Sequence, residues 1–527
     1  MVRTCLRAKG PCMASPSSPR VVVLGDIGRD EFYHLGDEAM TDAAAEALLR
    51  RGIDDIVLVA TEPSVAERLY GLAAVKRFGF WDSDDDRTLA RKFDGVKAAM
   101  SATPVAGTLD AAVRGADAVL IAGGGNLNSG HAGQLMERVA LATVARAHGK
   151  PLFVSGQTVG PYLREDHRSL IREMIDYATA FAARESFTFD MLSDLTDAGS
   201  VHHTLDDAAL LGEADAPDFG DRYAIGSFAN PDLHRVHREN AELIAERLDA
   251  VVERLDCDLV LLPHVGSLDD DRSLGDQLFH AAIAELSTTG RIRAERQLTG
   301  RQLAHATRRS IFSVSTRYHP AVFAPSTLTP SFPIGVSLYS AVRMKGALAN
   351  MGQQRTFLPL PIWEAGGAPD RIAELLEPAR AHLAEQAERT LDYQHRWWDA
   401  IARAITTGVW ESPGNLVAPQ PFAAEERNPE SYDTADDLIW QHWHRDHAEN
   451  QARLLAKRVD ELAADLTVER AHLRNLTTDL RAERARADEL RRRLRSVESR
   501  RVLRAVDTVA DAARRARRRA RRSTAAD

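Results

Sequence analysis

The stretch AVLIAGGGNL at residues 118–127 decides the fold of the first part of the chain. Its five leading apolar residues predict a short, fully buried strand. The three glycines that follow predict a sharp turn at the end of that strand. Similar apolar runs, each followed by helical periodicity, lie at 21–25, 56–60, 152–155 and 180–183. Strands that alternate with helices predict right-handed crossovers and a parallel sheet covered on both faces.

The same alternation restarts after an acidic, proline-containing stretch at 213–221. Further strands are predicted at 223–228, 259–262, 311–315 and 334–338. Helical periodicity over 370–408 predicts helices that return across both lobes. We therefore expect an α/β fold with an N-terminal lobe over 20–217 and a C-terminal lobe over 218–410. Ligands usually bind in the cleft between two such lobes.

The two ends of the chain have a different character. Residues 1–19 are irregular and proline-rich and predict a disordered leader, and residues 411–447 predict a linker. Over 448–500, apolar residues recur in alternating steps of three and four, which predicts a self-associating coiled coil. A single helix packed on the body is the alternative. The seam residues are Val459, Leu462, Leu466, Leu473, Leu476, Leu480, Ala487, Leu490, Leu494 and Val497.

Charge is unevenly distributed along the chain. The formal net charge is −9, yet residues 491–527 hold fourteen arginines and four acidic residues. The basic tail at 501–527 is therefore the part expected to contact polyanions, either an anionic membrane surface or, less favourably, nucleic acid, or it is simply solvated. It contains no interleaved aromatic residue, so no specific nucleic-acid site is expected. Three cysteines and no apolar stretch of about 18 residues predict a cytoplasmic protein.

Glycine, polar or charged residues follow six of the predicted strands. Because the carboxyl ends of parallel strands share one edge of the sheet, such residues gather where ligands bind. The residues concerned are Asp37; Gly123, Gly124, Gly125 and Asn126; Gln157; Arg184 and Ser186; Arg317 and His319; and Tyr339 and Lys345.

Each of these has an ordinary structural alternative. The glycine triplet is either a tight turn or a place where backbone N–H groups approach an anion. Asp37 can act as a helix N-cap, and Arg184 can pair with a nearby acid such as Asp206. Gln157 can belong to a turn, and His319 can be a hydrogen-bonded core histidine. Together, however, Arg184, Arg317 and Lys345 favour a small, multiply charged anion in an otherwise acidic body.

The same segments resemble the polysaccharide pyruvyl transferase family over about residues 21–352. The resemblance rests on LGDEA at 35–39, GGGNL at 123–127, GQTVGP at 156–161, ARES at 183–186, RYHPAVFA at 317–324 and the pair Tyr339 and Lys345. One departure is His34, where the family usually has asparagine.

This resemblance implies two Rossmann-like lobes, as in B-type glycosyltransferases. It also implies transfer of pyruvate from phosphoenolpyruvate to two hydroxyls of a glycan sugar as a cyclic ketal, with release of phosphate. His319 would then act as acid or base, with Asp37 as a second base or as a group that orients the acceptor. Arg184, Arg317, Lys345, Tyr339, Ser186 and the turn residues would bind substrate.

No metal or cofactor is expected besides phosphoenolpyruvate as co-substrate, and the glycan acceptor is either free or lipid-linked. Two other classes of function stay open. One is a nucleotide-sugar glycosyltransferase of the same architecture, for which the sequence offers no clear acid to bind the ribose hydroxyls. The other is a non-catalytic scaffold assembled by the coiled coil.

Overall fold

The computed structural model describes residues 18–101, 105–196, 199–423 and 429–523. The chain divides into two compact units, residues 1–447, here called the body, and residues 448–527. The predicted leader, 1–19, lies outside the described residues except for residues 18 and 19.

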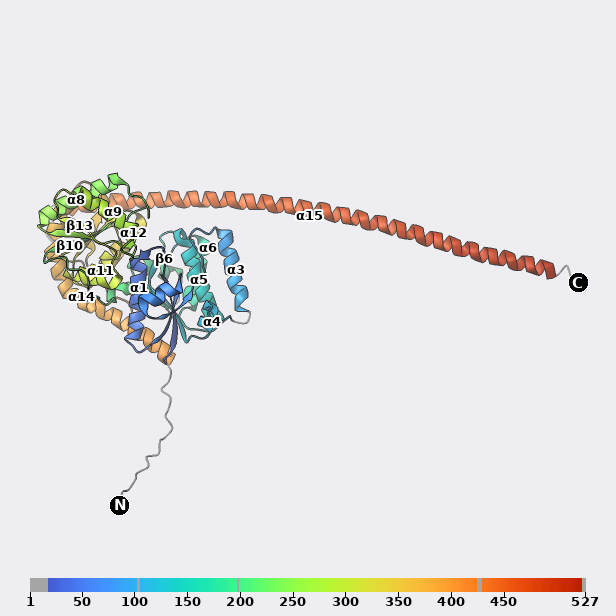
Figure 1. The fold of residues 1–527 in the computed structure, drawn as a ribbon, viewed down its shortest axis with the longest axis horizontal. Helices are drawn as coiled ribbons and strands as arrows, with labels where there is room; N and C mark the ends of the chain where they lie inside the picture. Colours follow the sequence, from blue (N-terminus) through green and yellow to red (C-terminus); the bar gives the residue numbers. More distant parts are fainter. Residues whose placement is uncertain (1–17, 102–104, 197–198, 424–428, 524–527) are drawn as a thin grey trace, which may run out of the picture. The chain divides into compact units, whose positions relative to one another are not determined.

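The N-terminal lobe of the body, blue to teal in Figure 1, is built on a parallel sheet. The strand order is β4-β3-β1-β5-β7-β8-β9, with β6 paired to β7. The 118–127 stretch supplies β5 and, directly after Ala122 and Gly123, β6, so the predicted turn is followed by another strand and not by a helix. The strands are β1 (Arg20–Ile27), β3 (Asp55–Ala60), β4 (Ala73–Lys76), β5 (Ala118–Ile121), β6 (Gly124–Leu127), β7 (Leu152–Val159), β8 (Ala180–Ala183) and β9 (Val201–His203).

The C-terminal lobe has a second parallel sheet in the order β13-β11-β10-β14-β15-β16. Its strands are β10 (Tyr223–Ser227), β11 (Asp258–Leu261), β13 (Ile292–Ala294), β14 (Ser313–Ser315), β15 (Ser331–Gly335) and β16 (Leu358–Pro359). The helices of the body are α1 (Leu35–Leu49), α2 (Pro63–Tyr70), α3 (Asp86–Met100), α4 (Leu109–Arg114), α5 (Ala132–Ala147), α6 (Glu165–Tyr177), α7 (Ser186–Leu195), α8 (Arg238–Leu255), α9 (Asp276–Leu286), α10 (Gly300–Arg309), α11 (Pro320–Ser326), α12 (Leu338–Ala349), α13 (Leu360–Glu364) and α14 (Ala368–Thr407).

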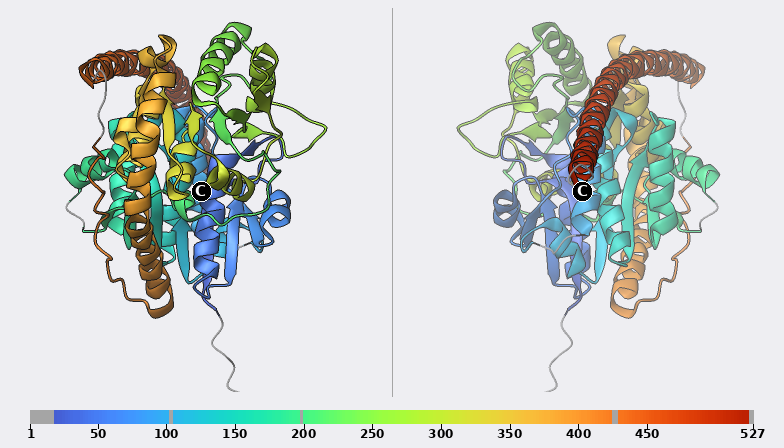
Figure 2. Two further views of the ribbon diagram at one scale, coloured as in Figure 1. Left: turned by 90° about the vertical axis from the view of Figure 1, so that its left-hand side faces the viewer. Right: turned by 90° about the vertical axis from the view of Figure 1, so that its right-hand side faces the viewer.

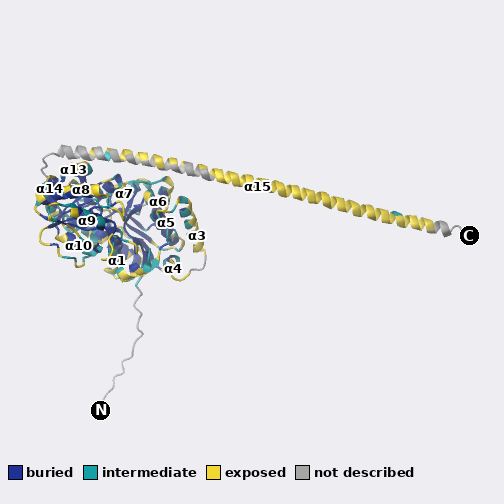
Figure 3. Ribbon diagram, turned by 45° about the horizontal axis from the view of Figure 1, so that its top comes forward, coloured by how far each residue is buried: buried dark blue, intermediate teal, exposed yellow. Residues whose placement is uncertain are grey.

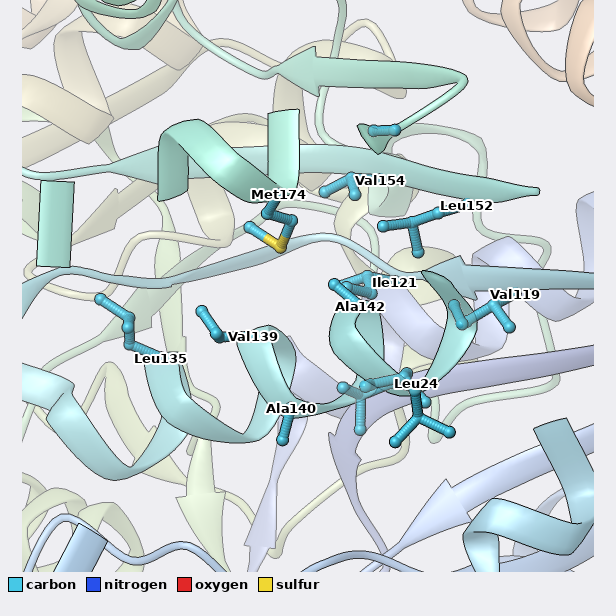
Figure 4. Close-up of a cluster of buried hydrophobic side chains, with 14 of the residues drawn as sticks. Leu24, Val119, Ile121, Leu135, Val139, Ala140, Ala142, Leu152, Val154 and Met174 are labelled. Atoms are coloured by element: carbon cyan, nitrogen blue, oxygen red, sulfur yellow. The ribbon is translucent and has the colours of Figure 1, made fainter. Parts of the chain in front are cut away.

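Fully buried strands explain the unbroken apolar runs in the sequence. On one face of the first sheet, side chains of β1, β5 and β7 pack against α5 and α6 (Figure 4). Both faces of these strands are covered, so apolar residues need not alternate with polar ones. The buried side chains include Leu24, Val119, Ile121, Leu152, Val154, Leu135, Val139 and Met174.

Two elements join the lobes. The short strands β2 (Tyr33–His34) and β12 (Val265–Gly266) form a two-stranded antiparallel sheet between the N-terminal and C-terminal lobes. Helix α14 runs along the body (Figure 2). Its first half packs in the core of the C-terminal lobe and its second half in that of the N-terminal lobe. The lobes are thus held together on more than one side.

The segment predicted as a linker, 411–447, differs from that prediction. Leu416 and Phe422 are buried, and the backbone N–H of Leu416 donates to the carbonyl of His203. From Pro429 the chain is helical, because α15 spans Pro429–Ser523. Apolar side chains of α15, such as Val459, Leu473 and Leu490, are exposed (Figure 3). Within the described part of the chain, no helix has the length and apolar character to cross a membrane.

Candidate active site

A cavity of about 340 Å³, here called the main cavity, opens between the two lobes of the body. The N-terminal lobe contributes His34, Gly36, Asp37, Gly125, Asn126 and Arg184 to its lining. The C-terminal lobe contributes His264, Arg317, His319, Tyr339 and Arg343. Most of the predicted strand-end residues therefore do meet in one place.

The glycine of the LGDEA segment is required by a contact across the lobes. A Cβ atom placed on Gly36 would lie 2.0 Å from Cε1 and 2.1 Å from Nδ1 of His319. The imidazole of the C-terminal lobe therefore rests directly on the backbone at the start of α1. Any side chain at residue 36 would occupy the volume of that ring.

One alternative for Asp37 was that it is the N-cap of α1, and this alternative is wrong. The helix begins at Leu35, and the Asp37 carboxylate instead pairs with Nδ1 of His34 at 2.8 Å. Although burial favours the neutral ring, this carboxylate raises the pKa of His34 above its ordinary value. Asp37 thus faces the main cavity with a histidine as its partner.

His319 is a buried residue with unused hydrogen-bonding capacity. It precedes Pro320 at the start of α11, and its Nε2 has no hydrogen-bond partner among the described residues. Burial, together with the charges of Arg184 and other neighbours, holds the pKa of His319 well below its ordinary value. The imidazole is therefore neutral, which is the form that acts as a base, and an anion bound beside it would raise this pKa again.

A second imidazole, His264, was missed by the sequence interpretation. Its Nδ1 lies 2.6 Å from Oγ of Ser227, whereas its buried Nε2 has no partner in the described part of the chain. Its backbone N–H donates to the Asp276 carboxylate at 3.1 Å. Burial lowers the pKa of His264 to about 3. The sequence could have indicated His264, because Pro263 and His264 come shortly after β11, just as the other site residues come shortly after their strands.

Both predicted arginines already have carboxylate partners. Arg184 is almost fully buried, and its Nη1 lies 2.5 Å from Oδ2 of Asp206, the pairing considered as its structural alternative. Arg317 makes two bonds to the fully buried Asp276, at 2.9 and 2.5 Å. Despite burial, Arg317 lowers the pKa of Asp276 to about 2. The described hydrogen bonds of each guanidinium use Nε and one terminal nitrogen, which leaves the other terminal nitrogen for a ligand.

Lys345 does not line the main cavity; its ammonium group lies over the rings of Phe357 and Trp440, at 4.9 and 5.0 Å from the ring centroids. Arg343 lines the cavity instead. Its guanidinium lies 3.8 Å from the centroid of the Tyr339 ring, and no ion pair links it to a carboxylate within the described ranges. Of the described residues, four arginines line the main cavity, Arg29, Arg184, Arg317 and Arg343, and Lys345 does not.

The glycine turn has a different role from the one predicted for an anion cradle. The N–H of Gly123 donates to the Asp207 carboxylate at 2.8 Å, and the chain continues into β6. Burial raises the pKa of Asp207 to about 7. Of this segment, Gly125 and Asn126 reach the main cavity, and the Tyr339 hydroxyl donates to the carbonyl of Gly125.

Other predicted residues lie away from the cavity. Gln157 is buried, and its side-chain nitrogen donates to the carbonyl of Ala122 at 2.6 Å, so it supports the turn. Ser186 is exposed at the start of α7 and does not line the main cavity. Among the residues that the structure describes, no three His, Cys, Asp or Glu side chains are grouped so that they could hold a metal ion.

Comparison with known structures concerns the fold alone, because identities are low. A putative UDP-N-acetylglucosamine 2-epimerase from Listeria monocytogenes is 14% identical, with a TM-score of 0.51 over 76% of this chain and 100% of that one. An S. aureus MnaA–UDP co-structure (14%, TM-score 0.48, 77% and 100%) and the glycotransferase of kitacinnamycin (13%, 0.46, 74% and 99%) are also similar.

Family comparison is more specific. No curated protein matches the sequence. The family model described as polysaccharide pyruvyl transferase matches residues 34–337, which run from His34 at one wall of the main cavity through His319 at the other. This match covers more than half of the chain, and the chain therefore belongs to the polysaccharide pyruvyl transferase family.

Proposed function

We propose that the protein transfers the pyruvyl group of phosphoenolpyruvate to two hydroxyls of a glycan sugar, forming a cyclic ketal and releasing phosphate. The observation that carries this proposal is that Arg184, Arg317, Arg343 and His319 line one cavity, and that Nε2 of His319 has no hydrogen-bond partner among the described residues. Phosphoenolpyruvate combines a carboxylate and a phosphate, about three negative charges at neutral pH. Guanidinium groups suit both anions because their donors are arranged as a fork.

The reaction needs two proton transfers. In the first step one sugar hydroxyl bonds to the central carbon of phosphoenolpyruvate, its proton passes to a base, and the methylene carbon gains a proton to become a methyl group. In the second step the other hydroxyl displaces phosphate from the same carbon, and the phosphate carries away the remaining proton. His319 suits the base, and His264 can pass the same proton on to the methylene carbon once the bound anion has raised the pKa of both rings, because both present a buried Nε2 without a described partner. Asp37 would orient the acceptor hydroxyls.

A panel of four variants tests this assignment with two measurements on the full-length chain. The first is the shift of the thermal midpoint by phosphoenolpyruvate. The second is ketal-linked pyruvate in the envelope glycan of host cells that carry only the variant. His319→Gln and His264→Gln should keep the shift and lose the ketal. Arg343→Met should bind phosphoenolpyruvate about tenfold or more weakly, since a hydrogen bond to a charged group contributes about 1.5–3 kcal/mol. Lys345→Met is the matched control and should keep both.

Three outcomes would contradict the proposal. The proposal would lose its basis if phosphoenolpyruvate did not stabilise the wild-type chain. It would also lose its basis if the glycan of the wild-type host lacked ketal-linked pyruvate. Release of nucleotide from a sugar donor would favour a glycosyltransferase. A His319→Gln chain that supports normal ketal levels, while loss of 448–500 abolishes them, would favour a scaffold.

We also propose that α15 associates with a second copy of the chain through its heptad seam. Val459, Leu466, Leu473 and Leu480 are between 51% and 63% exposed in the single chain, and covering such a row of side chains favours association. Light scattering should therefore give the full chain at least twice the mass of one polypeptide, whereas a chain ending at residue 447 should scatter as a single copy. Equal copy numbers for the two chains would show that the heptads do not assemble the protein.

A further inference from the structure

A second, smaller cavity of about 230 Å³ lies beside the main one and is here called the Trp81 cavity. The two cavities share Arg29 and Gln134 in their linings. All residues that line the Trp81 cavity belong to the N-terminal lobe, and none of them is one of the proposed proton carriers. The space therefore extends the site within the N-terminal lobe.

The loop that carries Trp81 is held firmly in place. Its backbone packs on α5, because a Cβ atom on Gly133 would lie 2.1 Å from the carbonyl carbon of Trp81. The Asp82 carboxylate accepts from the backbone N–H of Gln134 at 3.2 Å and pairs with Nδ1 of His131 at 3.0 Å. A wall built in this way needs little ordering when a ligand binds, which favours affinity.

The charges around the Trp81 cavity are already balanced. The Asp26 carboxylate pairs with Arg29 at 3.1 Å and with Arg77 at 2.8 Å, and Glu137 lies 3.2 Å from Arg77. These guanidiniums lie 5.9 and 5.0 Å from the centroid of the Trp81 ring. The cavity is therefore less suited to a second strongly charged anion than the main cavity is.

Its remaining groups suit a ring that carries hydroxyls. The partly buried Trp81 indole lines the cavity, and its apolar ring surface can pack on the C–H groups of a sugar. The Oε1 atom of Gln134 is buried without a hydrogen-bond partner in the described part of the chain, and Ser83 adds an exposed hydroxyl. At about 230 Å³ the space is below the roughly 300–1,000 Å³ of pockets for drug-sized ligands. One sugar ring fits this description better than a nucleotide does.

We propose that the Trp81 cavity is the acceptor subsite and binds a pyranose ring of the glycan through Trp81 and Gln134. This inference rests on the proposed function, because the bound sugar would direct its two hydroxyls past Arg29 and Gln134, which line both cavities, into the main cavity. The anionic donor and the hydroxylated acceptor thus enter different compartments of one site.

The variant Trp81→Ala tests the subsite in the two measurements described above. Ketal-linked pyruvate in the envelope glycan should fall at least tenfold, the thermal shift by phosphoenolpyruvate should be unchanged, and Trp81→Phe should retain most of the ketal. Gln134→Leu, which removes both polar atoms of the side-chain amide at a similar size, should also lower the ketal content. Phe187→Ala is the matched control, because this exposed aromatic on α7 lines neither cavity.

Two results would overturn the subsite. Normal ketal content in both Trp81→Ala and Gln134→Leu would exclude acceptor binding there. Loss of the phosphoenolpyruvate shift in a folded Trp81→Ala chain would assign the cavity to the donor. A wild-type chain without ketal formation is a separate outcome, because it overturns the proposed function before the subsite is reached.

Discussion

Replacing Gly36 by alanine is expected to reduce pyruvyl transfer by about 100-fold or more, although a single methyl group is added. The new Cβ would lie 2.0 Å from the His319 ring, so the imidazole must move by more than an ångström. A displacement of about 1 Å at a reacting group costs on the order of 10²-fold in rate. The measurement is ketal formation in cells that carry the variant, together with the thermal midpoint of the purified chain.

Gly95→Ala is the matched control for this substitution. Gly95 lies within α3, and a Cβ atom there would have no neighbour within 4 Å. Alanine in a helix is about 1 kcal/mol more favourable than glycine, so this variant should be as active as the wild type and slightly more stable. If Gly36→Ala retained normal transfer, the position of His319 against α1 would have no bearing on the reaction.

Removal of the Arg184 side chain should mainly destabilise the body. Arg184→Ala leaves the Asp206 carboxylate buried without its cation, and breaking a buried pair in this way costs about 3–5 kcal/mol. Adding Asp206→Asn to the same chain removes the buried charge and should recover part of the loss. The free energy of unfolding of both chains, measured with denaturant, checks this expectation.

The contrast with an exposed ion pair makes the result specific. Arg403 and Glu411 form a 2.7 Å pair in which both side chains are more than half exposed, so Arg403→Ala should cost no more than about 1 kcal/mol. An Arg184→Ala chain as stable as Arg403→Ala would show that Asp206 is not held by Arg184. If the expected loss is found, a missing phosphoenolpyruvate shift in Arg184→Ala cannot identify a ligand contact, and Arg343→Met is the informative variant.

The sequence predicted the parallel lobes because their strands are covered on both faces and appear as unbroken apolar runs. The sequence also predicted that Asp37, Arg184, Arg317 and His319 lie close together, since each follows a predicted strand, and all four do line the main cavity. It offered Asp206 as a partner for Arg184, which the structure confirms, but it named no acid for Arg317. Asp276, the partner of Arg317, lies on α9 and becomes a neighbour only in the folded chain.

The error at Lys345 has a simple geometric cause. On α12, Tyr339 and Arg343 are four residues apart and therefore share a face, whereas Lys345 is six residues from Tyr339 and points elsewhere. The rule that ligand-binding residues follow the carboxyl ends of parallel strands correctly marked the start of this helix. It does not predict which side of the helix faces the ligand. For the glycine triplet the sequence left two interpretations open, because three glycines do not indicate whether a helix or a strand follows.

The small sheet of β2 and β12 has a consequence for how ligands come and go. Main-chain hydrogen bonds pair His34 with Val265, and the N–H of Leu35 donates to the carbonyl of His264 at 2.8 Å. A clamshell motion that swung the lobes apart at this seam would rupture these bonds and pull His34 and His264 out of position. Ligands of the main cavity must therefore enter and leave through its open side, while β2 and β12 keep the two lobes paired.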